Sequence, residues 1–226
     1  MPGSKSLTNR ALPIAALAEG TTTVSGALVA EDSEVMLRAL EKLGVALEAR
    51  GETVVVHGVG GPLPARSAEL DLRLSGTSLR FLTAILAAGH GEYVLDGTAR
   101  MRERPVGDLL DALARLGADA TGVDGRPPVR LRASGLSGGT VSVRGDVSSQ
   151  FLSGLLMASP LAKGPLAIEV EGELLSKPFV DMTLDVMAHF GVTARRDGYR
   201  RFEVEPSTYR ARDYQVEGDA MAAGYF

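Results

Sequence analysis

The sequence repeats one pattern three times, and this repeat constrains the fold more than any other feature. Each copy opens with small hydroxyl residues and continues into an apolar helix, a glycine and a β-rich run. The openers surround Ser4, Ser75 and Ser148. A second, amphipathic helix then ends at an apolar residue followed by Gly44, Gly117 or Gly191. These landmarks recur at intervals of roughly 70 residues, which is typical of a chain built from equivalent structural units.

Each unit is predicted to have the order β-α-β-α-β-β. In the second unit, residues 70–74 alternate apolar and polar as a half-buried strand does. Residues 75–77 then begin a helix that runs to about Ala88, and Pro105 opens the amphipathic helix. Asp124-Gly125 is a strong hairpin signal. The first helix of each unit is apolar almost all round and so belongs at the centre. We therefore predict an α/β domain (α+β in some classifications) with helices packed inside and sheets outside.

The ends of the chain depart from this repeat. The first unit has no opening strand, because only a few residues precede its helix. Residues 213–216 resemble an opening strand, and residues 217–220 would begin a further helix, within which the sequence stops. We therefore expect a fragment of a longer protein, with its three units at about 1–66, 67–137 and 138–212.

Composition argues against several classes of function. The formal net charge of −4 speaks against broad nucleic-acid binding, which needs a basic face. No apolar stretch reaches the length of a membrane helix and the N-terminus lacks a signal-peptide core, so we expect a cytoplasmic protein without membrane contact. There is no cysteine, and the three histidines lack metal-ligand spacing, so no metal site is predicted. Residues 58–61 fail the dinucleotide fingerprint, and no cofactor is expected.

The three openers predict a site for an anionic ligand. A helix N-terminus presents unpaired N–H groups and partial positive charge, and therefore favours phosphate or carboxylate. A hydroxyl residue at a single helix start is most often only a cap. Three equivalent openers with cations beside them instead favour one shared site for a small, multiply anionic ligand. The basic residues that accompany the openers are Lys5, Arg10, Arg80, Arg102, Arg104 and Lys177.

The same residues resemble the 5-enolpyruvylshikimate-3-phosphate (EPSP) synthase family. The matching stretches occur in the family's order and are 2–11, 75–77, 102–105, 147–151, 175–178 and 216–219. The resemblance implies a two-domain enzyme with three such units in each domain. The whole of 1–226 is similar to the N-terminal domain, with residues 213–226 starting the crossing into a missing C-terminal domain. Family members, expected to be monomers, transfer the enolpyruvyl group of phosphoenolpyruvate to the 5-hydroxyl of shikimate-3-phosphate in aromatic amino-acid biosynthesis. They need no metal or organic cofactor.

The resemblance also implies roles for individual residues. Lys5 would lie between the two substrates and act in catalysis. Arg10 would hold the shikimate-3-phosphate carboxylate through two hydrogen bonds. The full set for shikimate-3-phosphate is Lys5, Ser6, Arg10, Ser148, Ser149, Gln150 and Ser176. The set for phosphoenolpyruvate is Lys5, Gly76, Arg104 and Gln150. Further groups belong to the other domain, so this domain alone is expected to bind shikimate-3-phosphate weakly without turnover.

Four positions depart from the family pattern, and one of them is Pro13, where Leu is common. Leu74, Phe81 and Phe179 stand where Asn, Pro or Leu, and Tyr are usual, which leaves substrate affinity and the response to the herbicide glyphosate open. Two other interpretations also stay open. A UDP-N-acetylglucosamine enolpyruvyl transferase-like domain shares the implied fold, although that family normally opens with Lys-Asn and often uses a loop cysteine. A non-catalytic repeat module, whose hydroxyl residues only cap helices, is the second.

Overall fold

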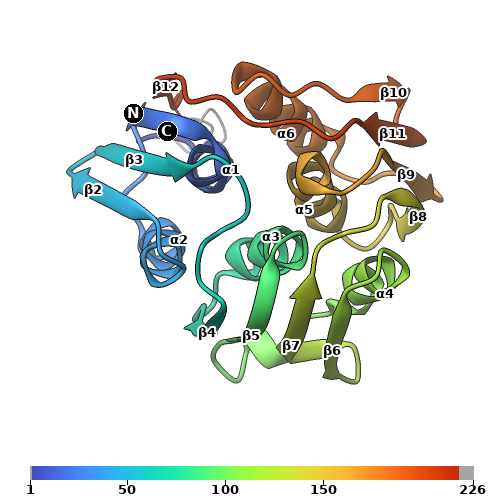
Figure 1. Cartoon of the computed structure of the whole chain (residues 1–226). Helices are drawn as coiled ribbons and strands as arrows, with labels where there is room; N and C mark the ends of the chain where they lie inside the picture. The colour runs from blue at the N-terminus through green and yellow to red at the C-terminus, as the bar shows by residue number, and fades with distance from the viewer. Residues whose placement is uncertain (1, 219–226) are drawn as a thin grey trace, which may run out of the picture.

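The three predicted units are present, and each forms a four-stranded sheet on the outside of the molecule (Figure 1). The structure is a computed structural model that describes residues 2–218. The first unit contains α1 (Lys5–Leu17), β1 (Glu19–Ser25), α2 (Glu31–Lys42), β2 (Ala46–Arg50) and β3 (Thr53–Val59). The second contains β4 (Ser67–Asp71), α3 (Gly76–Ala87), β5 (His90–Asp96), η1 (Met101–Glu103), α4 (Gly107–Arg115), β6 (Asp119–Val123) and β7 (Arg126–Ser134). The third contains β8 (Gly139–Arg144), α5 (Ser149–Ala158), η2 (Ser159–Leu161), β9 (Leu166–Glu171), α6 (Lys177–His189), β10 (Arg195–Asp197) and β11 (Arg201–Val204), and β12 (Tyr214–Gln215) follows.

All three sheets share one topology. The strand orders are β12-β1-β3-β2, β4-β5-β7-β6 and β8-β9-β11-β10, and in each sheet only the first pair is parallel. The strand expected at residues 213–216 is therefore present as β12, and it supplies the opening strand that the first unit lacks. Val24 pairs with Tyr214, and Ser25 pairs with Gln215. The further helix expected to begin at residues 217–220 falls largely outside the described residues.

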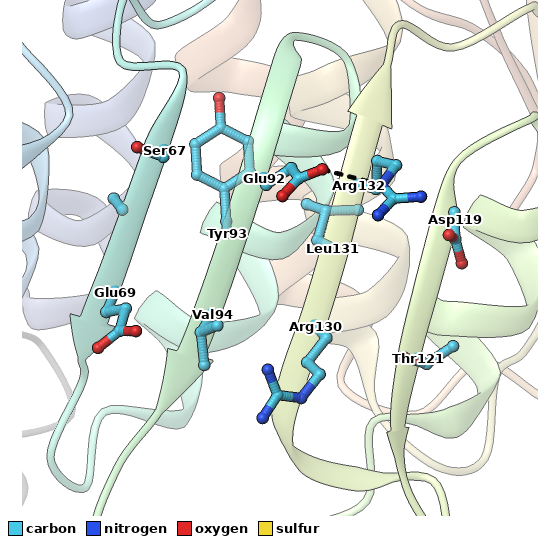
Figure 2. A pocket seen from close by; sticks show the side chains of 11 residues that line it. Ser67, Glu69, Glu92, Tyr93, Val94, Asp119, Thr121, Arg130, Leu131 and Arg132 are labelled. Atoms are coloured by element: carbon cyan, nitrogen blue, oxygen red, sulfur yellow. Dashed lines mark hydrogen bonds and ion pairs between the residues drawn. The ribbon is translucent and has the colours of Figure 1, made fainter.

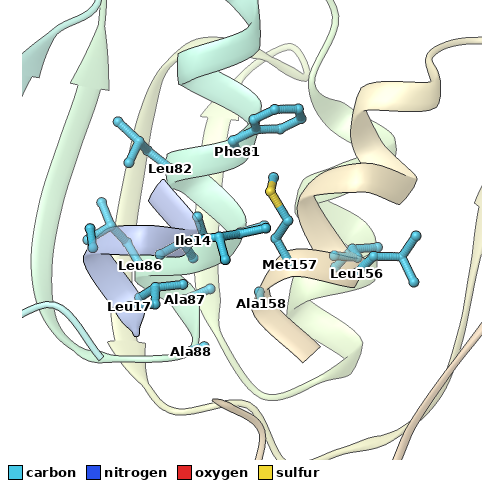
Figure 3. Close-up of a cluster of buried hydrophobic side chains, with 14 of the residues drawn as sticks. Ile14, Leu17, Phe81, Leu82, Leu86, Ala87, Ala88, Leu156, Met157 and Ala158 are labelled. Carbon is cyan, nitrogen blue, oxygen red and sulfur yellow. The ribbon is translucent and has the colours of Figure 1, made fainter. Parts of the chain in front are cut away.

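The first helices of the three units, α1, α3 and α5, form the centre of the molecule, as predicted. Side chains from all three helices meet there, including the fully buried Ile14, Phe81 and Met157 (Figure 3). The amphipathic helices pack around these central helices: α2 against α1 and α3, α4 against α3, and α6 against α5 and α1. None of the helices in the described part of the chain combines the length and apolar character needed to cross a membrane.

Two element boundaries differ from the prediction. The strand expected at residues 70–74 is β4, which ends at Asp71, because Arg73 takes a left-handed conformation with φ of 51° that breaks the extended run. The helix expected to open at Pro105 is α4, which begins at Gly107 after an N-cap at Val106. The predicted hairpin turn between β6 and β7 is confirmed.

Candidate functional site

The three helix openers converge on one hollow of about 340 Å³, called here the opener hollow. Its lining comes from the first two turns of α1 and α3, from the start of α5 and from the residues around the start of α6. Seven of the nine predicted site residues line it: Lys5, Ser6, Arg10, Ser148, Ser149, Gln150 and Ser176. The lining is completed by residues to which no binding role had been assigned: Asn9, Thr77, Arg80, Val147 and Phe179.

The hydroxyl groups of the openers divide into two roles. One hydroxyl in each opener caps its helix by accepting a backbone N–H bond at 3.2 to 3.5 Å, and these caps are Ser4, Ser75 and Ser148. A later hydroxyl in each opener lines the hollow, and these residues are Ser6, Thr77 and Ser149. Ser148 lines the hollow as well as capping α5. Capping therefore accounts for one hydroxyl per opener and leaves another beside the unpaired N–H groups of the first turn.

Arg10 is a buried cation beneath the hollow, with 2% of its surface exposed. Its guanidinium donates to Thr183 Oγ1 at 2.7 Å, to the Ser6 carbonyl at 2.8 Å and to the Phe179 carbonyl at 2.9 Å. A weaker bond reaches Ser153 Oγ at 3.5 Å. Because an arginine has five N–H donors, one N–H on Nη1 is left for a ligand. This geometry therefore offers a single hydrogen bond in place of the two-point grip expected from the family resemblance.

Two of the departures from the family pattern meet at Arg10. The ring centroids of Phe81 and Phe179 lie 5.3 Å and 5.9 Å from its Cζ, within the range of cation–π contact. No carboxylate among the described residues pairs with this guanidinium. Burial lowers the pKa of Arg10 to about 10, so the side chain stays charged at neutral pH. Aromatic faces and neutral oxygens thus take the place of a counter-ion.

A second buried arginine, Arg80, orients Gln150. Arg80 is 8% exposed, and its Nη1 donates to Gln150 Oε1 at 2.7 Å. Gln150 Nε2 donates in turn to Thr77 Oγ1 at 2.9 Å, which links the second and third openers. The two bonds fix the orientation of the amide and leave its second N–H for a ligand. Burial, and then the nearby charge of Arg104, lower the pKa of Arg80 to about 10.

Gly76 and Arg104, the other two predicted site residues, lie beside the hollow rather than in its lining. A Cβ atom on Gly76 would lie 2.6 Å from Arg104 Nη1 and 2.9 Å from Arg80 Nη1. A larger residue here would displace one or both guanidinium groups, which approach the backbone of this opener closely. The approach also brings the two cations of the second unit together.

Lys5 is paired with Asp32, an acidic residue outside the predicted site. Its Nζ lies 3.0 Å from Asp32 Oδ2, in the first turn of α2, while about half of the Lys5 side chain remains exposed. The available signal was the acidic first turn of α2, because the repeat places the N-termini of α1 and α2 at the same end of the unit. Asp32 is the one acidic partner of the four cations in this part of the described chain, Lys5, Arg10, Arg80 and Arg104.

Two basic residues expected beside the openers are engaged elsewhere. Arg102 forms a two-point ion pair with Asp96, with Nε 3.0 Å from Oδ1. This hydrogen bonding lowers the pKa of Asp96 below its usual value. Lys177 lies 3.7 Å from Glu173 and over the ring of Tyr199. Neither cation lines the opener hollow.

Two larger hollows, of about 550 Å³ each, have a different character. One is the outer face of the second sheet, where Arg132 Nε lies 3.0 Å from Glu92 Oε1 and the charges compensate one another (Figure 2). The other runs along β4 and includes the Arg102–Asp96 pair. No helix opener lines the hollow on the outer face of the second sheet. Across residues 2–218, no three His, Asp or Glu side chains gather as metal ligands would. Converging cations with one acidic partner among the described residues, rather than size, single out the opener hollow.

Comparison with known proteins identifies the family of the chain. The family model described as EPSP synthase (3-phosphoshikimate 1-carboxyvinyltransferase) matches residues 1–226. The chain belongs to the EPSP synthase family. It is 50% identical over 232 residues to the 3-phosphoshikimate 1-carboxyvinyltransferase of Marinomonas sp. (strain MWYL1), and 48% identical over 233 residues to that of Shewanella denitrificans. All of the chain is covered in both comparisons, and 55% and 54% of the relatives.

A solved structure of the EPSP synthase of Acinetobacter baumannii gives the same result for the fold. It superimposes with a TM-score of 0.89 at 30% sequence identity, covering 99% of this chain and 50% of that one. The predicted enolpyruvyl transferase-like fold is confirmed by this match. The chain spans about half the length of the curated EPSP synthase relatives that it matches.

Proposed function

We propose that this chain is the N-terminal, shikimate-3-phosphate-binding domain of an EPSP synthase. In this proposal, 1–226 is a single domain, and residues 213–226 begin the crossing to a C-terminal domain that completes the enzyme. The observation that carries the proposal is the convergence of three helix N-termini and three cations on one hollow, with Arg104 beside it and a single acidic partner among the described residues. Such a site suits a small molecule with several negative charges.

Shikimate-3-phosphate carries a phosphate and a carboxylate, and the hollow offers donors for both. Ser148, Ser149 and Ser176 hold the phosphate and ring hydroxyls, with the N-terminus of α5 adding backbone N–H groups and partial positive charge. Ser6 and the remaining N–H of Arg10 hold the carboxylate. The ligand charge then supplies the counter-ion that the buried arginine lacks among the described residues.

Phosphoenolpyruvate lies beside it, against Gly76 and Arg104, with Gln150 and Lys5 touching both molecules. Lys5 stabilises the negative charge that develops as the 5-hydroxyl gives up its proton and adds to C2 of phosphoenolpyruvate while C3 gains a proton. Phosphate then leaves the tetrahedral intermediate as C3 loses a proton, which restores the double bond. Catalysis in this scheme is proximity together with electrostatic stabilisation. The other phosphoenolpyruvate-binding groups and the proton-transfer carboxylates come from the C-terminal domain. This chain alone therefore binds shikimate-3-phosphate weakly and turns nothing over.

A ligand titration tests the proposal. Shikimate-3-phosphate should raise the melting temperature progressively, by an amount that corresponds to about 2.7 kcal/mol at a hundred times the Kd. Ser149→Ala and Lys5→Ala should weaken binding about tenfold or more, since each removes a hydrogen bond to a charged group. Arg132→Ala, on the outer sheet face, is the matched control and should bind as the parent does.

The alternatives predict other results. A UDP-N-acetylglucosamine-specific domain would be stabilised by the UDP-sugar and not by shikimate-3-phosphate. In a non-catalytic module, Lys5→Ala and Arg104→Ala would leave ligand binding unchanged. A separately produced C-terminal domain should restore turnover when it is added, and product formed by the 226-residue chain alone would contradict the proposed division of the site.

A further inference from the structure

Asn9 is a buried amide without a hydrogen-bond partner in the described part of the chain. It lies in α1 and is 1% exposed, and its Oδ1 is one of four buried side-chain polar atoms there that lack a partner. Buried amides are nearly always hydrogen-bonded, because an unpaired polar group loses its interactions with water and gains nothing in return. The position of Asn9 therefore needs an explanation beyond packing.

The opener hollow supplies that explanation. Asn9 lines it one turn after Lys5 and Ser6, which share its face of α1. A second of the four unpaired atoms, Nε of Arg80, belongs to the same lining. Two of the four unmet hydrogen-bonding groups thus meet at one place, as they would where a bound molecule satisfies them.

The neighbouring polar groups are already engaged with one another. Arg10 is bonded to Thr183 and to two carbonyl groups, and Gln150 is held between Arg80 and Thr77. Asn9 takes part in neither network. Rotation about χ2, which is soft in asparagine, presents either amide atom to the hollow. The amide is thus placed to contact a ligand without disturbing the charged groups.

We propose that Asn9 is a specificity-determining residue that hydrogen-bonds a hydroxyl group of the ligand. An ionised phosphate or carboxylate oxygen only accepts hydrogen bonds, so it cannot satisfy the amide oxygen, whereas a hydroxyl both donates and accepts. The cations hold the anionic groups, and Asn9 recognises the neutral part of the same molecule. This inference rests on the proposed function, in which the ligand is a phosphorylated, hydroxylated ring acid.

The test uses Asn9→Leu, which keeps the shape of the side chain, in the 226-residue chain. Shikimate-3-phosphate and its 4-deoxy and 5-deoxy analogues are titrated into parent and variant by calorimetry. The parent should prefer shikimate-3-phosphate over one of the analogues by about tenfold, the loss of a well-formed hydrogen bond. In Asn9→Leu this preference should fall to about one, while the ligand-free variant melts at or above the parent's temperature.

Thr22→Val is the matched control. It also removes an unpaired buried oxygen, but from β1, outside the hollow. It should leave the parent's preference intact. The inference is overturned if Asn9→Leu keeps the preference, or if it lowers the melting temperature of the ligand-free chain, since the amide would then have a structural partner such as a buried water. Failure of the parent to bind shikimate-3-phosphate would instead overturn the proposed function, and the inference with it.

Discussion

At the scale of single residues, Ser176 combines a hydroxyl in the opener hollow with an unfavourable backbone conformation. Its φ and ψ of 59° and 41° are left-handed, which costs a residue with a Cβ about 1–2 kcal/mol. Its side chain makes no capping bond to α6, although it occupies the N-cap position. Strained residues of this kind concentrate where function holds them in place. The proposed role of Ser176 in holding shikimate-3-phosphate would account for a strained residue at this position.

Two substitutions separate the hydroxyl from the backbone. Ser176→Gly and Ser176→Ala should both weaken shikimate-3-phosphate binding about tenfold, because each removes the same donor. Ser176→Gly should be more stable than Ser176→Ala by about 1 kcal/mol, because glycine adopts the left-handed conformation readily. Urea unfolding and calorimetry measure the two effects. Equal stability of the two variants would show that the backbone is unstrained, and undiminished affinity would remove Ser176 from the site.

The sequence could predict the opener residues, because hydroxyl residues recur at the same helix start in each of the three units. For Asp32 it offered only the acidic first turn of α2, which does not show the pairing with Lys5, and for Asn9 it offered no signal. Asp32 reaches Lys5 only because α1 and α2 pack together, and the unpaired state of Asn9 depends on what every neighbouring group contacts. Such facts arise from packing and leave no local pattern.

At the scale of elements, the site depends on how closely α3 and α5 approach each other. A Cβ on Gly154 of α5 would lie 3.1 Å from the Arg80 carbonyl oxygen and 3.3 Å from Ala84 Cβ, both in α3. This close packing lets the Arg80 guanidinium reach Gln150 at 2.7 Å. The glycine in the middle of the helix therefore sets the spacing between the second and third openers.

Enlarging that residue should damage both stability and binding. Gly154→Val should lower the free energy of unfolding by about 1–3 kcal/mol through overpacking, and should weaken shikimate-3-phosphate binding by displacing Arg80 from Gln150. Gly107→Ala in α4 is the control, since its Cβ would meet Gly125 Cα at an ordinary 3.4 Å. Its stability should change by less than about 1 kcal/mol, and its affinity should not change. Normal shikimate-3-phosphate binding by Gly154→Val would show that the spacing between α3 and α5 does not determine the geometry of the site.

Elements were predictable from the sequence where a local backbone requirement sets them, and not where the residue type carries no such signal. The glycines that end the amphipathic helices, Gly44, Gly117 and Gly191, have φ of 91°, 94° and 87°, so a local backbone requirement made the repeat visible. The hairpin at Asp124-Gly125 was predictable for the same reason, with φ of 51° and 68°. The end of β4 was not, because Arg73 takes a left-handed conformation that its residue type does not announce.

At the scale of the whole molecule, the first sheet is completed by a strand from the far end of the described chain. β12 lies parallel to β1, with the Val216 N–H donating to the Ser25 carbonyl at 2.8 Å. Tyr214 packs against His189 and Phe190, with ring centroids 5.0 Å and 6.1 Å away. The sequence shows a strand at this position but not its partner, because pairing across such a separation leaves no local trace. The three sheets become equivalent only in three dimensions.

The presence of β12 in the first sheet should therefore affect both the stability of the domain and the position of the first opener. A chain that ends at residue 212 loses β12 and the buried Val216, which leaves β1 as an open edge. It also loses the carbonyl of Glu217, which accepts the Ser4 N–H at 2.9 Å beside the start of α1. We expect its unfolding free energy to fall by about 3 kcal/mol or more, with self-association and weaker shikimate-3-phosphate binding.

A chain that ends at residue 218 provides the comparison, because it keeps every described contact of β12. Urea unfolding, size-exclusion chromatography with light scattering and calorimetry distinguish the two truncations. If β12 stabilises the first sheet, the chain that ends at 218 should unfold with a midpoint close to the parent's and remain monodisperse. The chain that ends at 212 should unfold at a lower urea concentration and self-associate. Equal unfolding midpoints for the two truncations would mean that β12 pairs with β1 without contributing to stability. Stability would then reside in the α1, α3 and α5 core, and the first opener would hold its position without the far end of the chain.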